Sequence, residues 1–190
     1  MKEGEILLKW KRWTVVLAAT MMLAACGDEG AKDGEVEVTL LPNYFEGMSE
    51  ADIEASAEDQ NIEVQEIHKD NSVTYMMTEQ RQEELLADVE ASIEESMKLL
   101  VETGDFPSIK DVEAKDDYLT FDVTVDRAAF ESGTDMIGTM NLYVGSSYLY
   151  GYKNEPNPSI TMNFIDSETQ EVYETIVLPD DMEVEDAEVQ

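Results

Sequence analysis

The sequence predicts an α+β fold, a single domain with a mainly antiparallel sheet and helices packed on one of its faces. Several short segments alternate apolar and polar residues, which is the pattern of strands with one buried face. One long segment, residues 79–102, repeats apolar residues at intervals of three and four, which is the pattern of an amphipathic helix. Strands that follow one another in short pairs favour antiparallel pairing, and together these segments place the domain at residues 35–179.

The first part of the domain is predicted to be a strand followed by a helix. In residues 35–40, three branched apolar side chains alternate with acidic or threonine side chains, as in a half-buried strand. Ser49 is expected to cap a helix, because Asp52 stands three residues later and can complete a capping box. This helix is expected to end near Asn61, whose short side chain tolerates the left-handed conformation that ends many helices.

A hairpin and the longest helix are expected next. Apolar residues at 62 and 64, and again at 73, 75 and 77, mark two strands. Lys69-Asp70-Asn71 between them supplies the turn chemistry. The helix over 79–102 has one apolar and one acidic face, and Gly104 and Pro107 prevent its continuation.

The second part of the domain is predicted to contain four more strands and a short helix. Residues 119–125 alternate most regularly, and residues 112–114 are expected to form a short neighbouring strand. Asp126 is expected to cap a short helix over 127–131. The last prediction is a terminal hairpin with strands at 160–164 and 172–178, a turn at 166–169, and Pro179 after the final strand.

Residues 135–150 leave two interpretations open. Some of their apolar residues fit one helix face, but Leu142, Tyr143, Leu149 and Tyr150 add apolar groups elsewhere around it. A helix that is apolar on several sides is either sandwiched between other elements or in contact with a partner. These four residues are therefore a candidate interaction surface.

The first 26 residues predict a lipoprotein signal peptide. Lys9, Lys11 and Arg12 precede an apolar stretch of about a dozen residues, which suits a signal peptide and is too short to span a membrane. The stretch ends in Leu23-Ala24-Ala25-Cys26, which resembles a bacterial lipobox. This resemblance implies cleavage of residues 1–25 between Ala25 and Cys26, and a diacylglycerol group on the Cys26 thiol. An ordinary secretory signal and a short buried helix are the alternatives.

Two polar segments flank the expected domain. Residues 26–34 comprise the cysteine and an acidic, glycine-containing stretch, which predicts a flexible tether. Residues 180–190 are mostly acidic and predict a disordered tail. The lipid would hold the domain on the outer face of the cytoplasmic membrane, since two acyl chains suffice for stable anchoring. A Cys26-Gly27 start favours a Gram-positive envelope.

The charge of the chain narrows the classes of partner. The sequence has 12 Lys and Arg residues against 44 Asp and Glu residues, a formal net charge of −32. Nucleic-acid phosphates repel so acidic a chain, so we expect no nucleic-acid partner. The same charge attracts cations, polycations and basic proteins, and it also serves solubility.

The sequence offers few candidates for catalysis or metal binding. His68 is the only histidine and Cys26 the only cysteine, and His68 lies beside a predicted turn. We expect no catalytic residue and no cofactor apart from the lipid. Asp116 and Asp117 are weak candidates for calcium, which prefers carboxylate oxygens, although no EF-hand loop is present. The many carboxylates leave a glycosidase-like pair of acids open.

Four stretches carry a resemblance to a group of proteins: LPNYFEG at 41–47, NSVTYMMT at 71–78, PSIKD at 107–111 and FDVTVDR at 121–127. They resemble small acidic lipid-anchored proteins of Gram-positive, Clostridia-like bacteria, over most of residues 35–179. The resemblance implies the location and the single-domain form but no activity. We therefore expect a membrane-tethered lipoprotein that binds an envelope protein or ligand without catalysis. A carboxylate-dependent hydrolase and a small solute-binding lipoprotein are the alternatives.

Overall fold

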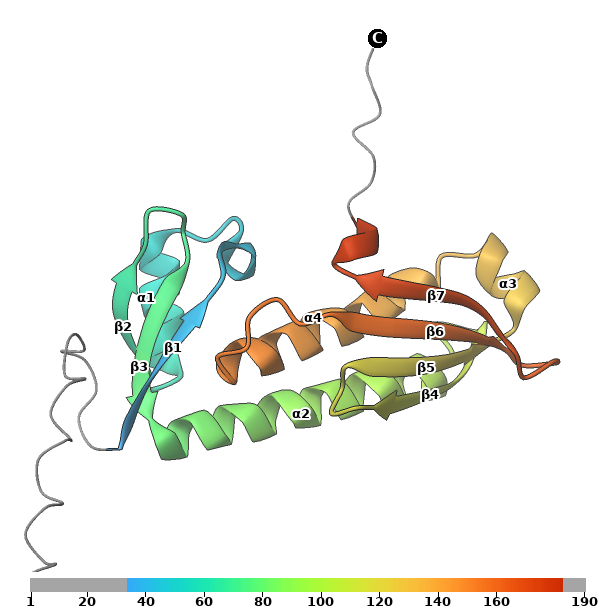
Figure 1. Cartoon of the computed structure of the whole chain (residues 1–190), viewed down its shortest axis with the longest axis horizontal. Helices are drawn as coiled ribbons and strands as arrows, with labels where there is room; N and C mark the ends of the chain where they lie inside the picture. Colours follow the sequence, from blue (N-terminus) through green and yellow to red (C-terminus); the bar gives the residue numbers. More distant parts are fainter. Residues whose placement is uncertain (1–33, 183–190) are drawn as a thin grey trace, which may run out of the picture. The chain divides into compact units, whose positions relative to one another are not determined.

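The computed structural model describes residues 34–182, and their fold is α+β, as the sequence predicts. The strands form two sheets rather than the single sheet expected (Figure 1). The reason lies in α2 (Glu79–Glu102), which has 24 residues and therefore advances the chain by about 36 Å between the early and the late strands. Each group of strands thus pairs within itself.

The first sheet is antiparallel throughout, with the strand order β1-β3-β2. Its strands are β1 (Glu35–Leu40), β2 (Glu63–Ile67) and β3 (Val73–Thr78). A short 3-10 helix, η1 (Pro42–Phe45), follows β1 and leads to α1 (Glu50–Asp59). The predicted capping box is present, because Ser49 and Asp52 each accept a hydrogen bond from the backbone N–H of the other. Asn61 has a φ of 54°, as expected for a residue just after a helix.

The helix α2 contributes to both hydrophobic cores of the described residues. Thr78 caps its start by accepting a hydrogen bond from the Arg81 N–H. Leu85 belongs to the core beneath the first sheet, whereas Ile93 and Leu100 belong to the core beneath the second. The two cores are therefore built on one continuous helix.

The second sheet has the strand order β4-β5-β6-β7. Its strands are β4 (Ile109–Lys115), β5 (Thr120–Val125), β6 (Ile160–Asp166) and β7 (Val172–Leu178). β5 and β6 are parallel, and the two outer pairs are antiparallel. The parallel pair is possible because α3 (Arg127–Ser132) and α4 (Met136–Tyr152) provide the long crossover that it requires. Asp126 caps α3, as the sequence predicts.

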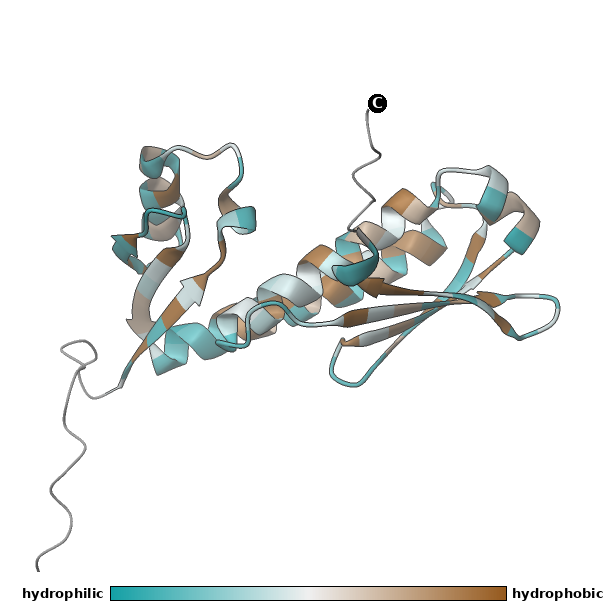
Figure 2. Ribbon diagram, turned by 45° about the horizontal axis from the view of Figure 1, so that its top comes forward, coloured by the Kyte–Doolittle hydropathy of each residue, from teal (hydrophilic) through white to brown (hydrophobic). Residues whose placement is uncertain are grey.

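The two faces of the second sheet differ in polarity. Phe121, Val123 and Val125 of β5 are fully buried in the same core as residues of α2 and α4. Apolar colour recurs along the strands of this sheet (Figure 2). The opposite face carries a polar row across all four strands: Lys115 donates to Asp122 at 2.6 Å, Asn163 donates to Asp122 at 2.9 Å, and Thr175 donates to Asn163 at 3.0 Å.

Residues 135–150, whose sequence leaves two interpretations open, correspond to the helix α4, which is packed between other elements of the fold. A Cβ added to Gly145 would lie 2.7 Å from Cγ1 of Ile93 on α2, so the two backbones approach closely at that point. A Cβ on Gly151 would lie 2.8 Å from Leu40 of β1. α4 therefore packs against α2 along its length and reaches the first sheet at its end.

The C-terminal boundary differs slightly from the prediction. Residues 180–190 are expected to be a disordered tail, but Asp180–Met182 form a short 3-10 helix, η2. The Val177 N–H donates to the Asp181 carboxylate at 2.7 Å, which fastens η2 to β7. The rest of the predicted tail, and the predicted signal peptide and tether up to residue 33, lie outside the described residues.

Candidate functional site

His68 lies in a hydrogen-bonded row of side chains on the first sheet. Its Nε2 lies 2.7 Å from Oγ1 of Thr74, which lies 2.9 Å from Oγ1 of Thr39, and its Nδ1 lies 3.5 Å from the Glu66 carboxylate. A carboxylate, an imidazole and a hydroxyl in this order can activate a nucleophile. However, Thr74 is only 5% exposed and its hydroxyl already bonds to Thr39, so it is poorly accessible to a substrate. These contacts link β1, β3 and the end of β2 through their side chains.

The calcium candidates Asp116 and Asp117 lie in the turn between β4 and β5. Asp116, Asp117 and Tyr118 have φ values of 51°, 57° and 67°, an unusual run of three left-handed residues that are not glycine. The Asp117 carboxylate accepts a hydrogen bond from Lys153 Nζ at 2.5 Å, and the Tyr150 hydroxyl donates to the Asp117 carbonyl at 3.1 Å. A calcium ion would therefore have to displace an ammonium group from Asp117.

The electrostatics of this turn indicate that Lys153 holds the turn in place through Asp117. Partial burial lowers the pKa of Lys153, but the hydrogen bond and charge of Asp117 outweigh it, so the pKa is raised overall. The ammonium also lies over the Tyr150 ring, 4.8 Å from the ring centroid. Among residues 34–182, no group of three or more His, Cys, Asp or Glu side chains is arranged to hold a metal ion.

The predicted interaction surface is wrong for three of its four residues. Leu142 and Leu149 are fully buried, and Tyr150 is 7% exposed, because α4 is covered by α2 and the sheets. Tyr143 is half-buried against the same core. The exposed apolar residues of α4 are instead Met136, Ile137 and Val144.

Several tyrosines lie between α4 and the first sheet. The Tyr44 hydroxyl donates to the Ser147 carbonyl at 2.8 Å, and the Tyr44 ring lies 4.6 Å from the Tyr148 ring, centroid to centroid. Burial raises the pKa of Tyr44 and of Tyr75 to about 12. Phenols with such pKa values stay protonated at neutral pH, so this cluster serves packing rather than proton transfer.

One concavity lies at the end of the first sheet and has a volume of about 380 Å³. Its floor includes the buried side chains of Phe45 and Ile53. Glu46 and Glu50 are the charged residues of its lining. It is small and combines a partly apolar floor with a negative rim.

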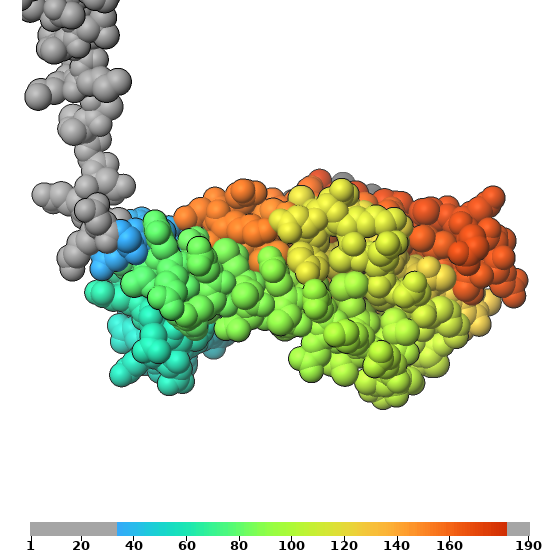
Figure 3. Space-filling view, turned by 90° about the horizontal axis from the view of Figure 1, so that it is seen from below, coloured from blue at the N-terminus to red at the C-terminus, as the bar shows by residue number. Residues whose placement is uncertain are grey.

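The second concavity, which we call the β4 groove, lies between α2 and the first strand of the second sheet and has a volume of about 410 Å³. In Figure 3, the green to yellow-green residues include those of α2, and the yellow residues of the β4–β5 region lie beside them. The groove is lined by Glu94 and Met97 of α2, Val112, Glu113, Ala114 and Lys115 of β4, and the turn residues Asp116, Asp117 and Tyr118.

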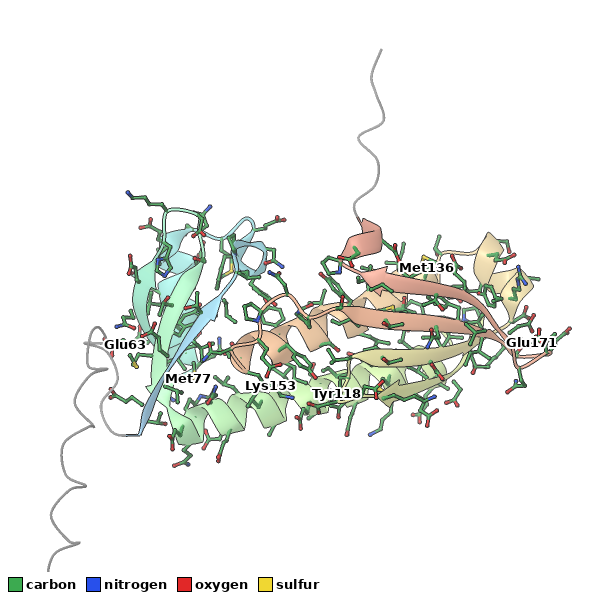
Figure 4. The ribbon with its side chains drawn as sticks, viewed as in Figure 1. Glu63, Met77, Tyr118, Met136, Lys153 and Glu171 are labelled. Carbon is green, nitrogen blue, oxygen red and sulfur yellow. The ribbon has the colours of Figure 1, made fainter. Side chains whose placement is uncertain are left out.

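The turn closes one end of the β4 groove. The Tyr118 hydroxyl contacts a Glu94 carboxylate oxygen at 3.4 Å, which joins the turn to α2. Figure 4 labels Tyr118 and Lys153 at this end, and Asp117 joins them through its ion pair with Lys153. The groove therefore has a fixed end, a partly apolar floor and an acidic lining.

The alternation at residues 112 and 114 predicts a strand, but only the packing of α2 against that strand produces the groove. Neither Glu94 nor Met97 is distinguished in the sequence from the other residues of its helix. The sequence therefore gives no indication that these residues share a surface with the β4–β5 turn.

Comparisons with protein-family models, with curated proteins and with solved structures found no match. The predicted lipidation site Cys26 and the cleavage site after Ala25 lie outside the described residues. Within residues 34–182, no helix is both long enough and apolar enough to cross a membrane.

Proposed function

We propose that this chain is a lipid-anchored binding protein on the outer face of the cytoplasmic membrane. The observation that carries the proposal is the order of three features at the N-terminus: a basic flank, an apolar stretch of signal-peptide length, and Leu23-Ala24-Ala25-Cys26. Each feature alone is common. Together they match what the lipid-attaching enzymes of bacteria recognise, and they leave Cys26 as the acceptor.

Three further observations support a binding role for the domain. The chain carries a formal net charge of −32, which favours association with basic partners. The β4 groove provides a concave, acidic surface at the edge of a sheet, where a partner can be held. The hydroxyl that contacts the His68 imidazole belongs to Thr74, which is 5% exposed, and this favours binding over nucleophilic catalysis.

The anchor is tested by labelling the chain in a Gram-positive host with an alkyne-bearing fatty acid. We expect the label on the wild-type chain and its loss in Cys26→Ser, together with retention of residues 1–25. The matched control is Cys26→Ser with Ala31→Cys, which keeps one thiol but moves it five residues along. Label on this control would contradict the proposal, because the thiol alone and not its sequence context would then direct acylation.

The location is tested on intact cells with a protease that cannot enter them. We expect the wild-type domain to be cleaved from the cell surface while a cytoplasmic marker stays intact. Protection of the domain until the cells are lysed would refute an outer-face location.

A further inference from the structure

The strand β4 has a free edge. It is the first strand of the second sheet and, within the described residues, pairs only with β5. In an edge strand, alternate backbone N–H and C=O groups point away from the sheet and can pair with another strand. The bulge between Ile109 and Asp111 interrupts the ladder, so regular pairing is available along the remainder of β4, from Asp111 to Lys115.

The side of β4 that faces α2 is apolar at this edge. Val112 is 8% exposed and belongs to the core of the second sheet. Ala114 and Met97 are partly buried against the same core, and both line the β4 groove. Apolar side chains of an added strand would therefore continue this core at every second residue.

The charged groups of the β4 groove are mostly negative. Its lining contains Glu94, Glu113, Asp116 and Asp117 but only one basic residue, Lys115. Lys115 Nζ is 2.6 Å from Asp122 and 3.6 Å from Glu113, so its charge is already compensated. Asp117 is paired with Lys153, and the shorter contact of Lys115 is with Asp122. The lining carboxylates that favour a partner bringing Lys or Arg side chains are therefore Glu94, Glu113 and Asp116.

We propose that the β4 groove binds an extended, basic segment of another polypeptide, which adds to β4 as a fifth strand. Its backbone pairs with the β4 edge and its apolar side chains pack on Val112, Ala114 and Met97. Its Lys or Arg side chains point to the other face of the sheet and approach Glu113. The recognised pattern is an alternation of apolar and basic residues over about five to seven positions, the length of β4. This inference deepens the binding role proposed above and does not depend on the lipid.

The test uses the protein comprising residues 26–190 and a fluorescent peptide in which Lys and Val alternate over seven residues. Binding is followed by fluorescence anisotropy. Three further peptides separate the contributions: one N-methylated at alternate residues, one with Glu in place of Lys, and one with Ser in place of Val. N-methylation removes backbone donors and keeps the charge, so we expect about a fivefold or greater loss of affinity. We expect the Ser peptide to bind more weakly and the Glu peptide not to bind.

Protein variants locate the peptide. Glu113→Gln should weaken binding by about two- to fivefold, as expected for a partly exposed ion pair, because Glu113 lies on the face of β4 to which the peptide's Lys side chains point. Glu168→Gln is the matched control, because Glu168 is exposed in the turn between β6 and β7. Peptide binding should also slow amide hydrogen exchange in residues 109–115. Thermal melting of each variant checks that the fold is retained.

Four results would overturn the inference. The N-methylated peptide would bind as well as the parent, which would show that charge alone attracts it. Glu168→Gln would weaken binding as much as Glu113→Gln. Alternatively, protection from exchange would appear along β7, β1 or β2 instead of β4. Failure of the Lys-Val peptide to bind at all would also refute the proposed occupant, while labelling at Cys26 would still test the anchor separately.

Discussion

The close approach of α4 to α2 at Gly145 predicts an effect of mutation opposite to that expected from helix propensity. Replacing a glycine in a helix with alanine ordinarily stabilises the helix by about 1 kcal/mol. At Gly145, however, the new Cβ would lie 2.7 Å from Cγ1 of Ile93, about 1 Å inside normal carbon–carbon contact. Ile93 is 1% exposed and has a stiff β-branched side chain, so it cannot move aside easily.

The size of the effect follows from these two opposing contributions. Overpacking in a core costs about 1–3 kcal/mol, which exceeds the gain in propensity. Gly145→Ala should therefore lower the free energy of unfolding by about 1 kcal/mol, measured by urea denaturation of the purified protein. In an Ile93→Ala background the obstructing atom is absent, so the same change should raise the free energy of unfolding by about 1 kcal/mol.

Asn141→Ala is the control, because Asn141 is exposed on the same helix and its replacement should stabilise by a few tenths of a kcal/mol. If Gly145→Ala stabilised the protein with Ile93 intact, the packing of α4 on α2 described above would be refuted.

Three other predictions concern the burial of α4, the polar row on the second sheet and the N-terminal cap of α1. Leu142→Ala should lower the free energy of unfolding by about 2–5 kcal/mol, because Leu142 is fully buried. Ile137 is 70% exposed, so Ile137→Ala should change the free energy of unfolding by less than about 0.5 kcal/mol. Equal effects of the two substitutions in denaturation curves would contradict the burial of α4. The hydrogen bond from Lys115 lowers the pKa of Asp122 below its ordinary value of 3.8, so this contact stabilises the fold above about pH 4 and is lost as pH falls through the lower pKa of the folded state. Asp122→Asn should therefore flatten the loss of stability between about pH 5 and pH 2, and an unchanged pH profile would show that the contact does not contribute. Ser49→Ala should cost about 1 kcal/mol in thermal or urea unfolding, with Ser49→Asp as the variant that retains a capping oxygen and should lose little.

The features that the sequence predicts correctly are those governed by neighbouring residues. The capping box at Ser49, the left-handed Asn61 and the cap at Asp126 each depend on a few adjacent side chains. The limits of α2 follow from its regular apolar spacing and from Gly104, which adopts a φ of 77°. Such local patterns need no knowledge of the rest of the fold.

The features that the sequence does not predict depend on contacts between distant segments. The alternation of apolar and polar residues along each strand is the same whether the strands form one sheet or two. Only the pairing between strands distinguishes the two arrangements. α4 is apolar on several sides, so its pattern alone does not say whether Leu142 meets a partner or the core. The glycines at 145 and 151 mark its contacts with α2 and β1, but their role becomes evident only once the neighbours are known.

The register of β1 has a mechanical consequence. The chain enters the domain at Glu35, which lies opposite Thr78, the residue just before α2. A pull on the chain ahead of Glu35, resisted by α2, would load the β1–β3 ladder at this one end and open it pair by pair toward Leu40 and Val73. Strands separated in this unzipping direction yield at low force, because only one pair bears the load at a time. The edge strand β1 is thus the part of the domain that would detach first under tension, while the second sheet keeps its pairing.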